Sequence, residues 1–148
     1  MFRLTRLTDY GILLTTRLAQ DPSRAAWSAR RLAAEARIPV PTASKVLKIL
    51  ARRGVLAACR GPRGGFHLAR SPRRISVTEV VSALQGPPVF TPCGPAERGC
   101  GREGLCRIRG HWRRIGAAVL RALRGITLAG LARPLRRRPA PAARRKGP

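Results

Sequence analysis

The chain has 148 residues, enough for one domain with a modest core and some appendages. Its 31 basic and 6 acidic residues give a net charge of +25, so its natural partner is a polyanion, with nucleic acid ahead of an anionic membrane. No stretch resembles a membrane span or a secretory signal, and we expect a cytoplasmic protein with no membrane association. The 6 acidic residues and 2 histidines form no acid–base or nucleophile–base set, which argues against an enzyme with a small-molecule substrate.

Two helices are predicted in the first part of the chain. The first follows Thr5 as its N-cap. Its apolar face consists of Leu7, Tyr10, Leu14 and Leu18. A shorter helix runs from a cap at Ser28 to Ala36, with Leu32 as its main apolar anchor. The residues up to Val40 then form a turn before a third helix, which is the order of a helix-turn-helix.

The stretch from Pro41 to Phe66 is interpreted as a DNA-recognition helix followed by a β-wing. Pro41 suits a first helical turn, because the amide that it lacks would have no partner there. One face of the helix is apolar and is formed by Ala43, Val46, Leu47 and Leu50. The opposite face is cationic and polar, with Lys45, Lys48 and Arg52, and Thr42 and Ser44 near the start. Gly54 is the expected C-terminal stop.

The wing is expected from two short β-prone runs, 55–60 and 66–70, joined by the basic, glycine-rich sequence GPRGG. In a winged helix-turn-helix, the helix enters the major groove of double-stranded DNA and the wing contacts the flanking backbone. The plainer interpretation is a solvated basic face and an ordinary turn, and the adjacency of the two features argues against it. Cys59, on the first wing strand, is expected to be a small buried apolar residue.

Two further helices are predicted after the wing, followed by a last short one. A capping box from Ser76 to Glu79 begins one helix, and the sequence GPP at 86–88 ends it. The other ends near Gly125 and carries an apolar seam at spacings of four and three, formed by Ile108, Trp112, Ile115, Val119 and Ala122. Such a helix pairs most simply with its copy in a second subunit; the alternative is that it packs on its own domain. Thr127 caps a last short helix.

The sequence therefore predicts a mainly α protein, a winged helix-turn-helix with a long C-terminal dimerisation helix. Residues 1–86 would form the DNA-binding domain, and 107–132 the dimerisation helix and the short terminal helix. Between them, 87–106 would form a cysteine-rich, cluster-binding loop, for which the spacing of its three cysteines is the reason. Residues 133–148 are basic and proline-rich with no acidic residue, and we expect a disordered tail that adds non-specific DNA affinity.

Three cysteines, Cys93, Cys100 and Cys106, lie in a C-x6-C-x5-C arrangement on an irregular segment. In a cytosolic protein this indicates metal or redox chemistry and not structural disulfides. Structural zinc prefers short pairs such as C-x2-C and four good ligands. Iron–sulfur clusters accept uneven spacings and a non-cysteine fourth ligand. An iron–sulfur cluster is favoured, with zinc and thiol redox chemistry as alternatives.

With these motifs in place, the chain resembles the IscR-like winged-helix transcription regulators, and among them the regulators of SUF-type iron–sulfur cluster assembly. The matching stretches follow the family's order within residues 2–132. They are RLTDYGILLTTRLA, PVPTASKVLKILARRGVL, RGPRGGFHLAR, ISVTEVVSALQGP, the cysteine loop, and CRIRGHWRRIGAAVLRAL with ITLAGLA. The resemblance implies a homodimeric repressor or activator on a DNA operator at the bacterial nucleoid, with one cluster per subunit, 2Fe-2S in preference to 4Fe-4S. The arginine-rich tail has no counterpart in the family.

The resemblance also implies a set of DNA contacts. In the recognition helix they are Pro41, Thr42, Ser44, Lys45 and Lys48, and in the wing they are Arg60, Gly61, Arg63, Gly64 and Gly65. Ser44 stands where some relatives carry an acidic residue, so the preferred DNA sites can differ. The alternative functions are a thiol-redox or zinc-dependent winged-helix repressor, or a non-specific nucleic-acid-binding basic protein.

The fourth cluster ligand is open. Some relatives use a histidine three residues after the last cysteine, where this chain has Arg109, a poor metal ligand because it is always protonated. His111 lies two residues further on, turned away by about 200° on a helix. Other relatives use an aspartate in the first helix of the partner subunit, and Asp9 matches that position and is preferred. The plainer interpretations are an ion pair for Asp9 and a surface imidazole for His111.

Overall fold

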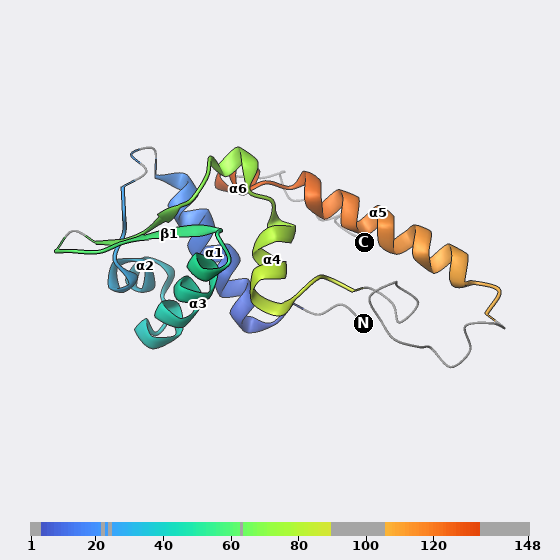
Figure 1. Ribbon diagram of the computed structural model, residues 1–148, viewed down its shortest axis with the longest axis horizontal. Helices are drawn as coiled ribbons and strands as arrows, with labels where there is room; N and C mark the ends of the chain where they lie inside the picture. The colour runs from blue at the N-terminus through green and yellow to red at the C-terminus, as the bar shows by residue number, and fades with distance from the viewer. Residues whose placement is uncertain (1–3, 22, 24, 63, 90–105, 134–148) are drawn as a thin grey trace, which may run out of the picture.

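A computed structural model of the chain describes residues 4–21, 23, 25–62, 64–89 and 106–133. Six α-helices, one short 3-10 helix and a two-stranded antiparallel sheet make up this part of the chain (Figure 1). In chain order they are α1 (Arg6–Gln20), α2 (Ala29–Ala36), α3 (Val40–Arg52), β1 (Leu56–Cys59), β2 (Gly65–Leu68), η1 (Pro72–Arg74), α4 (Val77–Gln85), α5 (Arg109–Gly125) and α6 (Leu128–Ala132). The mainly α, winged-helix architecture predicted from the sequence is confirmed.

Four of the helices begin where capping residues predicted. The side chains of Thr5, Ser28, Ser76 and Thr127 each accept a hydrogen bond from a backbone amide in the first turn of α1, α2, α4 and α6. At Ser76 the Glu79 side chain also accepts from the Ser76 amide, which completes the capping box. Local side-chain-to-backbone bonds therefore fix these starts.

Helix α3 begins at Val40, one residue before the predicted start at Pro41. The amide of Ala43 donates to the carbonyl of Pro39, so the first turn already includes Val40. At the other end Gly54 has φ +74° and the amide of Val55 donates to the carbonyl of Leu50, which is a Schellman ending. Gly54 is thus the C-terminal stop that the sequence indicated.

The hydrophobic core lies between α1, α2, α3 and α4. It is built mostly from leucine, isoleucine and valine, as the low aromatic content requires. The fully buried large side chains include Leu14, Leu32, Val46, Leu47, Leu50, Ile75, Val80 and Leu128. The whole predicted apolar face of α3 is buried, with each of its four side chains 0% exposed. The opposite, cationic face of the same helix is therefore left toward solvent.

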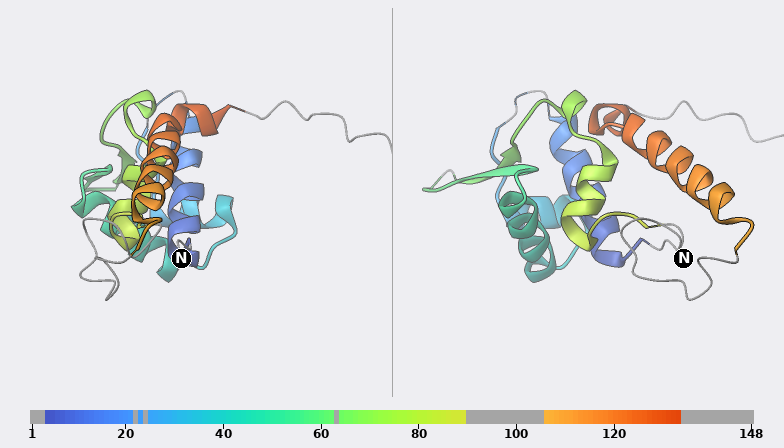
Figure 2. Two further views of the ribbon diagram at one scale, coloured as in Figure 1. Left: turned by 90° about the vertical axis from the view of Figure 1, so that its right-hand side faces the viewer. Right: turned by 45° about the vertical axis from the view of Figure 1, so that its right-hand side comes forward.

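The C-terminal helix α6 returns to this core. Its Leu128 is fully buried and belongs to the core cluster. The amide of Val77 donates to the carbonyl of Ile126, and the amide of Leu128 donates to the carbonyl of Ile75, both at 2.9 Å. Figures 1 and 2 show α6 beside the 3-10 turn that follows the wing. Helix α6 is thereby attached to the helix-turn-helix core.

Helix α5 extends away from that attachment point, and the wing projects from the other side of the domain (Figures 1 and 2). No residue of α5 is buried. The apolar seam lies on its exposed side: Ile108, Trp112, Ile115 and Val119 are between 37% and 55% exposed. Among the helices that the structure describes, none is long and apolar enough to cross a bilayer.

Candidate nucleic-acid interface and cysteine segment

The exposed face of α3 presents the side chains expected to read DNA. Lys45 and Lys48 are exposed, as is Pro41 in the first turn, whereas Thr42 and Ser44 are half-buried. The buried face behind them packs on α1 and α2, so the backbone of α3 is held firmly while its polar face stays accessible. A basic helix held in this way can enter the major groove of a duplex.

The wing is a short hairpin in which Leu56 pairs with Leu68 and Cys59 pairs with Gly65. Its connecting residues Arg60 and Gly61 are exposed, and Arg63 lies outside the described residues. A third backbone segment joins the hairpin at Trp27, whose amide donates to the carbonyl of Phe66 and whose carbonyl accepts from the amide of Phe66, both at 2.9 Å. This bridge links the wing to the α1–α2 connection. It was not foreseen from the sequence, because isolated pairing between distant segments leaves no periodic pattern.

The two glycines at the end of the wing loop are packed closely. A Cβ on Gly65 would collide with the carbonyl of Trp27, and a Cβ on Gly64 would collide with the carbonyls of Cys59 and Gly61. Both glycines are half-buried. Their predicted contact with DNA stays a prediction, and the structure gives them a role in holding the wing in place.

Trp27 is itself held by its neighbours. The indole nitrogen donates to the Asp21 carboxylate at 2.7 Å, and the Arg31 guanidinium stacks 3.6 Å from the ring centroid. Hydrogen bonds from the Ser23 hydroxyl, the Trp27 indole and the Ser23 amide hold the pKa of Asp21 below its ordinary value. The base of the wing therefore rests on a charged and hydrogen-bonded support.

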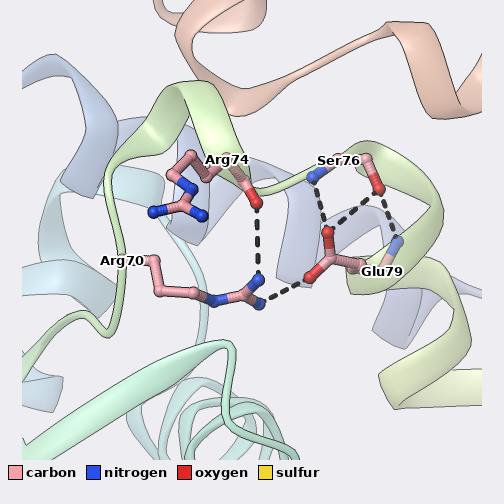
Figure 3. A network of polar contacts seen from close by, with 4 residues as sticks. All are labelled: Arg70, Arg74, Ser76 and Glu79. Atoms are coloured by element: carbon pink, nitrogen blue, oxygen red, sulfur yellow. Dashed lines mark hydrogen bonds and ion pairs between the residues drawn. The ribbon is translucent and has the colours of Figure 1, made fainter.

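A second polar network fixes the other end of the wing (Figure 3). Arg70, just after β2, donates to the Glu79 carboxylate and to the Arg74 carbonyl. Partial burial raises the pKa of Glu79, but hydrogen bonds from Arg70 and Ser76 outweigh that effect and hold the pKa below its ordinary value. The wing is thus tied to the N-terminus of α4, although an exposed ion pair of this kind contributes only about 0–1 kcal/mol.

The expectation for Cys59 was wrong: its side chain is exposed on β1. Its sulfur lies 3.7 Å from Nδ1 of His67 on the neighbouring strand. A two-stranded wing is too thin to bury both of its faces, so a strand residue there can face solvent although its neighbours are apolar.

Of the three cysteines in the predicted metal site, the structure describes only Cys106, which is half-buried just before α5. Cys93 and Cys100 lie outside the described residues. Within the described ranges no three histidine, cysteine, aspartate or glutamate side chains come together as a metal site. Asp9 in the first turn of α1 and His111 in the first turn of α5 are both exposed. Asp9 has no ion pair with any residue that the structure describes.

One hydrogen-bonded cluster joins the start of α1 to the end of α4, where the cysteine segment begins. The hydroxyl of Thr8, which is fully buried, donates to the Gln85 side-chain carbonyl at 2.7 Å. The amide of Thr5 donates to the same oxygen at 3.1 Å. Asp9 follows Thr8 directly, so the candidate aspartate lies at the end of the domain from which the cysteine segment leaves.

The recognition helix, the preceding short helix and the two-stranded wing define a winged helix-turn-helix DNA-binding protein. The profile of the Rrf2 family, described as iron-dependent transcriptional regulators, matches residues 4–134. The chain belongs to the Rrf2 family and is a DNA-binding transcription regulator; the relatives named below are regulators and not enzymes.

The comparisons with individual proteins agree with this assignment. The chain is 32% identical to the HTH-type transcriptional repressor NsrR of Streptomyces coelicolor over 131 residues, 87% of each chain. The structure of CymR, the global cysteine regulator of B. subtilis, superposes with a TM-score of 0.70 at 25% identity and covers 89% of this chain and 97% of CymR. The fold also matches T. potens IscR with a TM-score of 0.67 at 23% identity, over 87% and 85% of the two chains.

Proposed function

We propose that this regulator binds its operator as a homodimer and senses the supply of iron–sulfur clusters through its own cluster, controlling genes of SUF-type cluster assembly. The observation that carries the proposal is the three-cysteine segment, C-x6-C-x5-C, in a chain whose family is described as iron-dependent. Uneven cysteine spacings suit iron–sulfur clusters better than structural zinc. A DNA-binding regulator of this kind works in the bacterial cytoplasm.

The donor set fits a cluster chemically. Cys93, Cys100 and Cys106 would supply three thiolates, and Asp9 of the partner subunit is preferred over His111 as the fourth ligand. Asp9 is exposed and free of ion pairs among the described residues, so its carboxylate is accessible to a neighbouring subunit. A bound 2Fe-2S cluster, preferred over 4Fe-4S, would link these side chains covalently.

The homodimer is supported by the exposed seam of α5. Four large apolar side chains lie on one face of this helix, and each is more than a third exposed. A second copy of the same helix would bury all four against an identical apolar face. Changing Ile115 to Glu should convert the dimer to a monomer in sedimentation analysis, and the exposed Ala118→Glu, off the seam, is the control. Dimers of I115E at normal strength would contradict this pairing.

Coupling to DNA follows from where the ligands lie in the chain. Cys106 lies three residues before the first residue of α5, and the cysteine segment begins after Gln85, which is hydrogen-bonded to Thr8. Ligation of the three sulfurs of one subunit and Asp9 of the partner subunit would restrain the start of α5 against α1 of the partner. The two recognition helices of a dimer must match DNA half-sites about 34–36 Å apart, so a small rotation of one DNA-binding domain changes the affinity for the operator.

The decisive experiment is iron and acid-labile sulfide analysis of protein purified without oxygen. We expect about one cluster per subunit and visible absorption, and Cys100→Ala should remove both while the folded helical content stays unchanged. Colourless protein with stoichiometric zinc, or operator binding that is unchanged when all three thiols are removed, would refute cluster sensing.

A thiol-redox regulator is the second candidate, because two of the similar solved structures are of Staphylococcus aureus CymR, one of them in an oxidized form. Mass spectrometry of oxidised, iron-free protein distinguishes the two functions. A disulfide among the three cysteines that alone switches operator binding would favour thiol sensing.

Recognition of the operator sequence can be separated by experiment from non-specific electrostatic binding to DNA. Lys45→Ala should weaken operator binding more than binding to random DNA, because Lys45 is exposed on the groove-facing side of α3. Deleting the tail, residues 133–148, should weaken both kinds of binding alike and reduce the salt dependence. Loss of operator preference on tail deletion would contradict this division.

A further inference from the structure

Helix α5 has a second exposed face, which its seam does not use. At 100° per residue, Arg113, Arg114, Arg121 and Arg124 centre about 180° from the apolar seam. All four are exposed. We call these four side chains the arginine face. At the same helical spacing Gly110 and Ala117 lie on this face too, between or beside the arginines.

The arginine face is also distinct from the side of α5 that packs on the domain. The half-buried residues Gly116, Leu120 and Leu123 lie about 90° from both the seam and the arginine face. Pairing of two α5 helices through the seam would therefore leave the arginines accessible. No acidic residue occurs anywhere between residues 106 and 133, so nothing on α5 neutralises this charge.

The charge spacing fits a phosphate backbone. From Arg113 to Arg124 the helix rises about 16 Å, at 1.5 Å per residue. One strand of a duplex carries about five phosphates over that length. Ala117 lies between Arg114 and Arg121 on this face, and its small side chain leaves room for a phosphate backbone to approach the guanidinium groups. Arginine also binds phosphate oxygens with two donors at once.

The position of α5 determines which DNA it can reach. In both Figure 1 and the right-hand view of Figure 2, α5 lies across the domain from the wing. A duplex held by α3 and the wing therefore lies across the domain from α5. We propose that the arginine face binds the backbone of a second DNA duplex, so that the regulator bridges two DNA segments.

The test is a bridging assay with the full chain. A duplex that the protein itself selects from a random-sequence pool is fixed to beads, loaded with protein, and offered a labelled random-sequence duplex. Wild-type protein should capture the second duplex. Four phosphate contacts predict a slope of about −3.6 in log affinity against log salt, so doubling the salt should weaken capture about tenfold.

Two variants with the same net charge make the result specific. Changing Arg113, Arg114, Arg121 and Arg124 to Gln should lower capture at least about tenfold, with the operator footprint and iron content unchanged. The control changes four exposed arginines that lie outside α5, the recognition helix, the wing and the tail to Gln, and it should keep most of the capture. They are Arg17, Arg30, Arg37 and Arg73. Replacing the arginine face with four Lys should restore most of it, because the charge is retained.

Three outcomes would overturn the proposal. If the wild-type protein captures no second duplex, the arginine face is only solvated surface. Equal loss in the two Gln variants would show that net charge alone matters. A footprint that extends along the operator duplex and shortens in the arginine-face variant, without capture, would assign the face to flanking DNA.

Discussion

Replacing Gly65 with alanine should detach the base of the wing while the helical core stays folded. A Cβ at this position would collide with the Trp27 carbonyl, which is backbone and cannot rotate away. The wing would have to move, and both hydrogen bonds between Trp27 and Phe66 would be lost. At about 0.5–1.5 kcal/mol net for each bond, the expected loss is about 1–3 kcal/mol of unfolding free energy. That corresponds to a fall of about 4–12 °C in Tm.

The matched control is Gly116→Ala in α5. An added Cβ there meets no atom within 4 Å, so the variant should gain about 0.5–1 kcal/mol from helix propensity. Hydrogen exchange of the Trp27 and Phe66 amides, measured beside thermal unfolding and operator binding, gives the mechanism directly. If G65A keeps the wild-type Tm and slow exchange at both amides, the bridge does not hold the wing.

Three further outcomes follow from the contacts. Thr8→Val removes the buried hydroxyl that donates to Gln85 and should lower the unfolding free energy by about 1 kcal/mol, and no change in a urea titration would refute that role. Leu47→Ala leaves a cavity at a fully buried site in α3 and should lower the unfolding free energy by about 2–5 kcal/mol. A near-neutral result would mean that the neighbouring side chains move in to fill the cavity. The pKa of Glu79 is lower in the folded than in the unfolded state, so the stabilisation from its ionised carboxylate is full above about pH 4.5 and is lost as the pH falls through the folded pKa. Glu79→Gln should therefore show a smaller acid-induced fall in Tm than the wild type. An identical dependence of Tm on pH in the two proteins would mean that the bond between Glu79 and Arg70 is not stabilising.

Local chemistry explains why so much of the helical layout was predictable. An N-cap such as Ser76 and a stop such as Gly54 act through bonds to residues a few positions away, and these are visible in the sequence. The two faces of α3 are likewise encoded by a 3.6-residue period, because the same helix must bury one side and offer the other to DNA. The three cysteines were interpreted as a ligand set from their residue type and spacing, and that interpretation stays a prediction.

The sequence by itself therefore predicted the helices and the wing that the structure confirms. The DNA-reading face and the cysteine ligands that it indicates stay predictions. Tertiary structure alone decided how the helices and the wing are held: the Trp27–Phe66 bridge at the wing, the exposure of Cys59, and the return of Leu128 in α6 to the N-terminal core. It also left α5 with two free faces, one apolar and one cationic. The physical reason is range: caps and periods act within one or two helical turns, whereas burial depends on which distant segments meet, and that is settled only when the whole chain packs.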